Sequence, residues 1–245
     1  MRTSGVIACV GVILIFVTWE LACRLLSVPD FILPAPTAIL SAAVVQAPLL
    51  LPHAAVTALE IVLGIFLSLL VAVPLATVMF AHPSVERALS PFLVVSQAIP
   101  VFALAPLLVI WFGYGIASKV FMAAIIIFFP ITVSLLEGYK NCGSEYAMLF
   151  RLIGAGFWNT MRFLYWPWAL PFFFAGLKVG VTVATIGAVI GEWVGAQQGL
   201  GYLMIQANAR LRVDMVFAAI LWLSVMGLAM WICVGIIEKK VITWK

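Results

Sequence analysis

The sequence predicts an all-α protein that crosses a membrane several times. Of its 245 residues, 66% are hydrophobic and only 9% are charged, whereas roughly 25% of an average soluble domain is charged. Long apolar segments alternate with short polar connections, and a helix can satisfy all of its backbone hydrogen bonds inside a bilayer. We therefore expect one transmembrane domain over residues 1–245, embedded in lipid. A nucleic-acid partner is not expected, because the net charge of +4 is small and dispersed.

Six apolar segments are long enough to form spanning helices, which gives a polytopic membrane protein with six transmembrane helices. Glu20 and Arg24, near the end of the first segment, have the spacing of an ion pair on one helix face. A proline-rich stretch follows, and then the run 37–45, for which we expect a short helix in the membrane interface. The six spans are expected at about 6–26, 55–80, 89–112, 120–136, 169–190 and 215–236.

The distribution of basic residues predicts the orientation, because cytoplasmic connections carry an excess of Lys and Arg. With six spans, both chain ends lie on the same side. Eight basic residues lie on that side and four on the other, while Lys178 falls within a span. We therefore expect both termini in the cytoplasm. The eight are Arg2, Arg87, Lys140, Arg151, Arg162, Lys239, Lys240 and Lys245, and the four are Arg24, Lys119, Arg210 and Arg212.

Three polar side chains within the spans are candidates for lining a translocation pathway. Glu60 lies deep in the second span, where a carboxylate needs a cavity or a partner; packing within the bundle is the alternative. Gln97 precedes Pro100, which interrupts the third span, although such a kink is often only architectural. Glu192 lies at the outer end of the fifth span, either as a gate or protein contact or as an ordinary interfacial carboxylate.

No catalytic or metal-binding residues are expected. His53 and His82 are single histidines near a membrane surface, for which a structural role is expected, and no nucleophile stands beside a base. The four cysteines are scattered without a CxxC spacing, as in apolar helices where Cys is a small core residue.

The longest internal connection, at about 138–166, carries a pattern for two short helices. Ser144–Ile153 has helix-compatible composition, with a Ser before a Glu, and Gly154 follows at the position of a C-cap glycine. A second run, Phe157–Trp166, leads to Pro167 and the next apolar segment. We therefore expect a helix, a glycine turn and a second helix at the membrane surface.

This spacing resembles the cytoplasmic coupling loop of ABC-importer permeases. The family pattern is Glu-Ala-Ala, three further residues and Gly, then a spacer ending in Leu-Pro with another Pro following. Gly154 takes the glycine position, Ala155 follows it, and Pro167 and Pro171 take the two proline positions. The Glu-Ala-Ala is replaced by Met-Leu-Phe at 148–150, and Trp166 replaces the Leu before the first Pro.

Other stretches resemble particular branches of the family. The prefix at 29–37 and the run 99–119 resemble the nitrate, sulfonate and taurine permeases, as does the Gly-Leu-Gly turn at 199–201. The stretch Ala207–Leu211 resembles the branch linked to thiamine-pyrimidine precursors.

The resemblance implies the type I ABC-importer permease fold in a bacterial plasma (inner) membrane. It implies a second copy of the chain, two ABC ATPase subunits and an external or periplasmic substrate-binding protein as partners. ATP and magnesium would be bound by the ATPase, and no cofactor is expected in this chain, which lacks a GxxxxGK[ST] phosphate loop.

The resemblance also gives roles to residues of the loop. Gly154, followed by Ala155, would make the turn, while Phe157 and Trp158 would be apolar anchors on the ATPase. Glu145 and Arg151 would be charges at the rim of that contact. The alternative is a pair of helices that only lie on lipid.

The imported solute is expected to be a small organic molecule. A thiamine-precursor pyrimidine is the first choice by resemblance, and nitrate, taurine or an alkyl sulfonate is the alternative. A different class, a stand-alone ion-coupled carrier or an intramembrane enzyme, remains open. For a carrier, paired acids or discontinuous helices repeated in the two halves of the chain would be expected, and Glu60 and Glu192 are too isolated to make that case.

Overall fold

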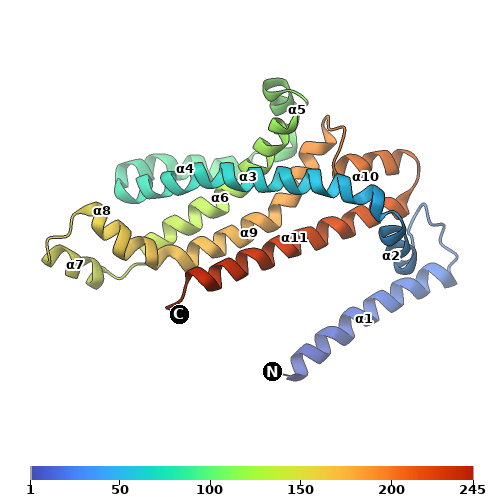
Figure 1. The fold of residues 1–245 in the computed structure, drawn as a ribbon, viewed down its shortest axis with the longest axis horizontal. Helices are drawn as coiled ribbons and strands as arrows, with labels where there is room; N and C mark the ends of the chain where they lie inside the picture. The colour runs from blue at the N-terminus through green and yellow to red at the C-terminus, as the bar shows by residue number, and fades with distance from the viewer. Residues whose placement is uncertain (1, 245) are drawn as a thin grey trace. The chain divides into compact units, whose positions relative to one another are not determined.

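The computed structural model describes the backbone of residues 2–244 and the side chains of residues 10–244 (Figure 1). Within these residues all regular structure is helical, which confirms the all-α class. In chain order the helices are α1 (Arg2–Leu25), α2 (Pro36–Val45), α3 (Ala47–Ala81), α4 (Pro83–Ala98), α5 (Val101–Phe112), α6 (Ile116–Lys140), α7 (Ser144–Leu152), α8 (Phe157–Thr160), the π-helical η1 (Met161–Tyr165), α9 (Trp166–Trp193), α10 (Leu200–Ala209) and α11 (Val213–Val241).

The chain divides into two compact units. The first contains the chain up to Val56 together with Gln197–Val225, and the second contains Thr57–Ala196 together with the chain from Met226. The loop and the three pathway candidates all belong to the second unit. The single domain over residues 1–245 stays a prediction.

In the first unit, polar contacts join the end of α1 to the start of α2. The Glu20 carboxylate accepts a hydrogen bond from Arg24 Nε at 2.7 Å, which confirms the expected ion pair. It also accepts hydrogen bonds from the backbone N–H and the hydroxyl of Thr37, at 3.1 and 2.8 Å. Before α10, the N–H of Gly199 donates to His53 Nδ1 at 3.0 Å, so His53 has a structural hydrogen bond.

The core of the second unit is built by α3, α6, α9 and the end of α11. Buried aliphatic side chains from these helices form one cluster, which includes Ile61, Ile127, Val181 and Val234. α6 and α9 run side by side along their lengths (Figure 1). This pairing is close because α9 presents glycines to α6: a Cβ added at Gly176 would lie 2.6 Å from the carbonyl oxygen of Pro130.

Lys178 of α9 has partners within this unit. Its ammonium forms an ion pair with Glu238 of α11 and lies 5.4 Å from the ring centroid of Trp231. These contacts account for a charge within the apolar segment of α9.

Four helical stretches in the described residues are long and apolar enough to cross a membrane: Ala47–Ala81, Ile116–Lys140, Phe157–Trp193 and Val213–Val241. The pair α4 and α5 adds a fifth if it is counted as one span. These five coincide with the expected second to sixth spans. The expected first span forms the helix α1 but is not among the stretches that meet this test, so the count of six stays a prediction.

The expected interruption at Ser96–Pro100 is present. α4 ends at Ala98, Pro100 is the residue that precedes α5, and the two helices are bent by 98°. Proline has no N–H for the helix ladder, which explains the position of the break. The expected third span is thus divided into two helices, α4 and α5.

Candidate functional site

The turn at Gly154 has the geometry of a Schellman motif. Gly154 has φ +72°, in the left-handed region that glycine adopts without a Cβ clash. The N–H of Ala155 donates to the carbonyl of Phe150 at 2.9 Å, and the N–H of Gly154 donates to that of Arg151 at 3.0 Å. These two bonds satisfy carbonyl groups at the end of α7 and fix the direction in which the chain leaves it.

The remainder of the loop follows the expected helix, turn and helix, with three differences. The residue that caps the N-terminus of α7 is Gly143, not Ser144, and it makes no side-chain cap. α6 continues to Lys140, so the connection begins three residues later than expected. The second helix does not end before Pro167: α8 passes through the π-helical turn η1 directly into α9. The loop is therefore continuous with a spanning helix.

Apolar side chains of the loop are exposed. Trp158 is 75% exposed, Ile153 76% and Leu152 72%, and Phe157 beside them is also exposed. Glu145 and Arg151 are exposed as well, whereas Ala155 is partly buried. An exposed apolar surface with charges beside it is typical of a protein contact.

A cavity of about 840 Å³ lies between α7 and the body of the second unit. Glu145, Arg151 and Cys142 contribute to its walls. Burial raises the pKa of the Cys142 thiol, which keeps it in the neutral form. At the adjacent end of α6, Lys140 forms ion pairs with Glu86 and Glu137.

Charged side chains gather far from this loop, where α6 begins and α9 ends. Lys119 of α6 is 2% exposed. Its ammonium donates three hydrogen bonds, to the carbonyls of Tyr114 at 2.6 Å, Gly115 at 3.0 Å and Gly195 at 3.4 Å. One cation thus ties the turn before α6 to the segment after α9.

Glu60 and Glu192 lie beside this lysine, and we call these three residues and Thr57 the buried charge cluster. Glu60 and Glu192 are 3% and 1% exposed. Their carboxyl groups lie within hydrogen-bonding range of each other and within electrostatic range of Lys119. The Thr57 hydroxyl donates to Glu192 Oε1 at 2.6 Å, and Glu60 Oε2 has no hydrogen-bond partner.

The structure thus brings together two of the three pathway candidates, which the sequence separates by most of the chain. Gln97, the third candidate, lies apart from them at the end of α4 with an exposed side chain. Lys119 and Thr57 were missed. The sequence signal that could have identified Lys119 is a lysine in the first turn of an apolar helix, since a charge there needs a partner.

The sequence comparisons identify the family. Residues 61–243 match the family described as "Binding-protein-dependent transport system inner membrane component". The chain belongs to this family. The match includes the whole loop and, apart from Thr57 and Glu60, the buried charge cluster.

Several relatives match nearly the full chain. A "Probable ABC transporter permease protein" of Haemophilus influenzae is 44% identical over 222 residues, 91% of this chain and 90% of that protein. The formylaminopyrimidine transport permease protein ThiX of Halalkalibacterium halodurans is 37% identical over 234 residues, 95% and 93% of the two chains. The riboflavin transport system permease protein RibX of Chloroflexus aurantiacus is 34% identical over 239 residues, 96% and 89% of the two chains.

Family membership fixes the general role of the chain. It is a membrane-embedded permease subunit of an ABC importer, with the type I importer permease fold, and it is a transport component rather than an enzyme. The family's transport depends on a binding protein and on an ATPase subunit. The range that matches the family, residues 61–243, includes the exposed loop.

Proposed function

We propose that this permease imports a small heteroaromatic solute, with a thiamine-precursor pyrimidine as the first choice, and that the loop around Gly154 receives the driving force. In this proposal the loop faces the cytoplasm, as both termini do, in a bacterial inner membrane. Two copies of the chain form the path, and each copy places its loop in a groove of one ATPase subunit. ATP and magnesium are bound there, and an external binding protein delivers the solute on the other side.

The observation that carries the proposal is the rigid, apolar and exposed turn. A docking element must hold its shape when it is pushed, and the Schellman bonds at Gly154 fix the direction in which the chain leaves α7. It must also present anchors, and Trp158, at 75% exposed, is the largest. Glu145 and Arg151 are charges at the rim of this surface. Charges in that position contribute more to the orientation of the bound ATPase than to the affinity for it.

A movement of the loop can reach the membrane-spanning helices through continuous helical structure. α8, η1 and α9 form one uninterrupted helical stretch, and α9 packs closely along α6. A displacement of the loop is therefore transmitted to the buried charge cluster at the far ends of α6 and α9. In this proposal Glu192 and Glu60 hold those ends together and take part in closing the path on the outer side, and Gln97 lines the path.

The solute is chosen from the names of the relatives. The permeases ThiX and RibX carry the names of formylaminopyrimidine and riboflavin, each of which contains a planar heteroaromatic ring system. Nitrate, taurine and alkyl sulfonates remain the alternative set. Selectivity is expected to lie mainly with the binding protein, so its ligand is the first measurement.

The ion-coupled carrier has one observation in its favour, the proximity of Glu60 and Glu192. The Lys119 ammonium beside them supplies the compensating charge that a coupling ion would otherwise supply, so the cluster is explained without transport of an ion. Uptake into vesicles that contain the permease without any ATPase would establish the carrier instead.

The test of coupling is the substitution Gly154→Val. A β-branched residue at φ +72° is strained by about 1–2 kcal/mol or more, so the turn opens. In the complete importer reconstituted in liposomes, the ATPase rate stimulated by loaded binding protein should fall about tenfold.

The matched control is Gly156→Val, two residues away. Gly156 has φ −68° and nothing within 4 Å of an added Cβ, so this substitution should leave the stimulation unchanged. Equal stimulation in the Gly154→Val and wild-type importers, with both inserted in the membrane, would contradict the coupling role.

A further inference from the structure

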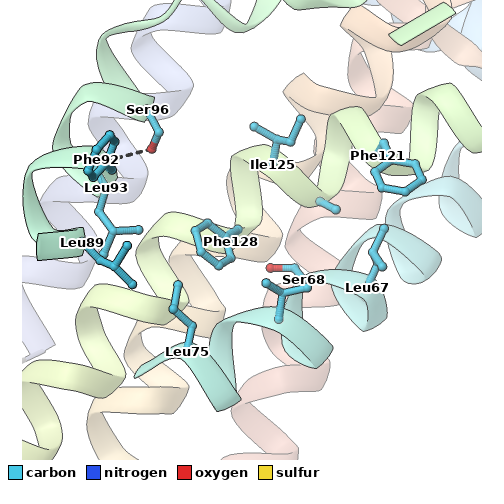
Figure 2. A pocket seen from close by; sticks show the side chains of 12 residues that line it. Leu67, Ser68, Leu75, Leu89, Phe92, Leu93, Ser96, Phe121, Ile125 and Phe128 are labelled. Atoms are coloured by element: carbon cyan, nitrogen blue, oxygen red, sulfur yellow. Dashed lines mark hydrogen bonds between the residues drawn. The ribbon is translucent and has the colours of Figure 1, made fainter. Parts of the chain in front are cut away.

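A second cavity lies within the spanning helices of the second unit, away from the loop and the buried charge cluster. Its volume is about 450 Å³, which is within the range of small-molecule sites. The walls come from α3, α4 and α6, and nearly all of the lining atoms are apolar. Figure 2 shows the side chains of these three helices arranged around the cavity.

Three of the twelve residues that line the cavity are aromatic. Phe121 and Phe128 come from α6 and Phe92 comes from α4, with aliphatic side chains between them. Phe92 is 71% exposed, so the wall of the cavity reaches the surface of the chain. Aromatic side chains favour offset-stacked or edge-to-face contact with another ring, so the walls suit a flat ligand.

One polar atom in the wall has no partner. The Ser68 side chain is 2% exposed, lines the cavity, and its hydroxyl makes no hydrogen bond within the described residues. In Figure 2 this hydroxyl points toward the side occupied by Phe128. A helical serine can bond to the carbonyl four residues earlier, as Ser224 does at 2.9 Å. Ser68 does not, and a buried hydroxyl left without a partner is destabilising.

The position of the cavity agrees with a transport role. Ser68 and Phe128 lie in the middle parts of α3 and α6, and Ser96, which also lines the cavity, lies just before the break between α4 and α5. Discontinuous helices near the membrane midplane are where transporters build their substrate sites. The Ser96 hydroxyl donates to the Leu93 carbonyl at 2.7 Å, which leaves its oxygen able to accept.

We infer that this cavity holds the uncharged heteroaromatic ring of the solute during its passage, with the ring against Phe121, Phe128 and Phe92 and a ring acceptor bonded to the Ser68 hydroxyl. This inference rests on the proposed import function and names the class of solute. No Lys or Arg lines the cavity. A sulfonate or nitrate anion would lose its hydration there without compensation, so the cavity selects against it.

The first experiment measures binding to the permease assembled with its ATPase in lipid nanodiscs, without the binding protein. Formylaminopyrimidine, riboflavin and taurine are the three probes, used in equilibrium dialysis. At least one of the two heteroaromatic probes should bind, and taurine should not. Taurine binding as tightly as both rings, or binding of none of the three, would overturn the inference.

The second experiment changes Ser68→Ala. Loss of one hydrogen bond should weaken binding of the heteroaromatic probe about threefold to tenfold. The thermal stability of the complex should stay equal or rise, because the unpartnered hydroxyl is gone. A purely structural role for Ser68 gives no change in affinity, and that result would overturn the inference.

Two further variants guard against ambiguity. Phe92→Leu removes a ring from an exposed position and should also weaken binding, whereas Ser224→Ala, at an exposed serine of α11, should not. If a lipid chain fills the cavity instead, the probe binds somewhere else. A lipid with a brominated chain will then displace neither probe, and Phe92→Leu will leave probe affinity unchanged. That pair of results would contradict the inference.

Uptake separates this inference from the proposed function. If the complete importer shows no ATP-dependent uptake of any candidate solute, the proposed function fails. If uptake proceeds and Ser68→Ala and Phe92→Leu leave the KM for uptake and the probe affinity unchanged, only the assignment of the cavity fails.

Discussion

Lys119 joins three stretches of backbone with one side chain. Its three N–H donors are all used by carbonyl oxygens, and its charge lies beside two buried carboxyl groups. Glu60 Oε2 has no hydrogen-bond partner of its own, so the nearby ammonium is its main source of compensation. Removing that cation leaves buried acidic groups without an opposite charge.

This arrangement predicts a large effect of Lys119→Met. The substitution preserves the approximate volume but removes the charge and three hydrogen bonds, which should destabilise the permease by about 3–5 kcal/mol. Thermal unfolding of the purified permease in detergent would measure it. The control Lys239→Met, at an exposed position, should be nearly neutral, and a loss below about 1 kcal/mol at Lys119 would show that the cluster is dispensable.

Single residues differ in how far the sequence predicts them. Gly154 was predictable because its role is local: a helix-compatible run ends and a left-handed residue must follow. The partners of Glu60 were not predictable. Lys119 and Glu192 come from two other helices, and whether they face Glu60 depends on the rotation of each helix about its axis. For the same reason, the sequence showed Lys119 only as a charge at a turn.

At the scale of the helices, the close packing of α9 against α6 gives a prediction for stability. α9 contacts α6 through glycines, and a Cβ at Gly176 would meet the Pro130 carbonyl oxygen at 2.6 Å and Ser134 Cβ at 2.7 Å. Gly176→Ala should therefore force the helices apart and cost about 1–3 kcal/mol, measurable by chemical unfolding in detergent micelles. Gly156→Ala, with nothing within 4 Å, is the control; equal stability of the two variants would show that α6 and α9 can separate freely.

The positions of the helices were largely predictable from apolar runs, but their ends were not. α3 begins at Ala47, several residues before the expected start at about 55, because the helix continues through Pro52 and His53. The π-helical turn at Met161–Tyr165 was not anticipated, since its residues have the same composition as an ordinary helix. The break at Pro100 was predictable because proline acts on its own backbone.

For the whole molecule, the distribution of basic residues predicts the orientation, and labelling can test it. The four native cysteines are first replaced by Ala, and Asn159→Cys and Gln198→Cys are then made separately; both positions are exposed. A membrane-impermeant maleimide should label Gln198→Cys in intact cells. It should label Asn159→Cys only after the membrane is opened and the ATPase removed. The reverse pattern would invert the topology and remove the loop from the ATP side.

The π-helical turn between α8 and α9 determines the direction in which the exposed side chains of the proposed coupling loop point. A π turn contains about one residue more than an α turn, so side chains before it are rotated by about 100° relative to those beyond it. Deleting one residue within Met161–Tyr165 would swing Trp158 around the helix axis while α9 kept its glycine face toward α6. If the loop binds the ATPase as proposed, the direction of that contact can change without a change in the packing of α9 on α6.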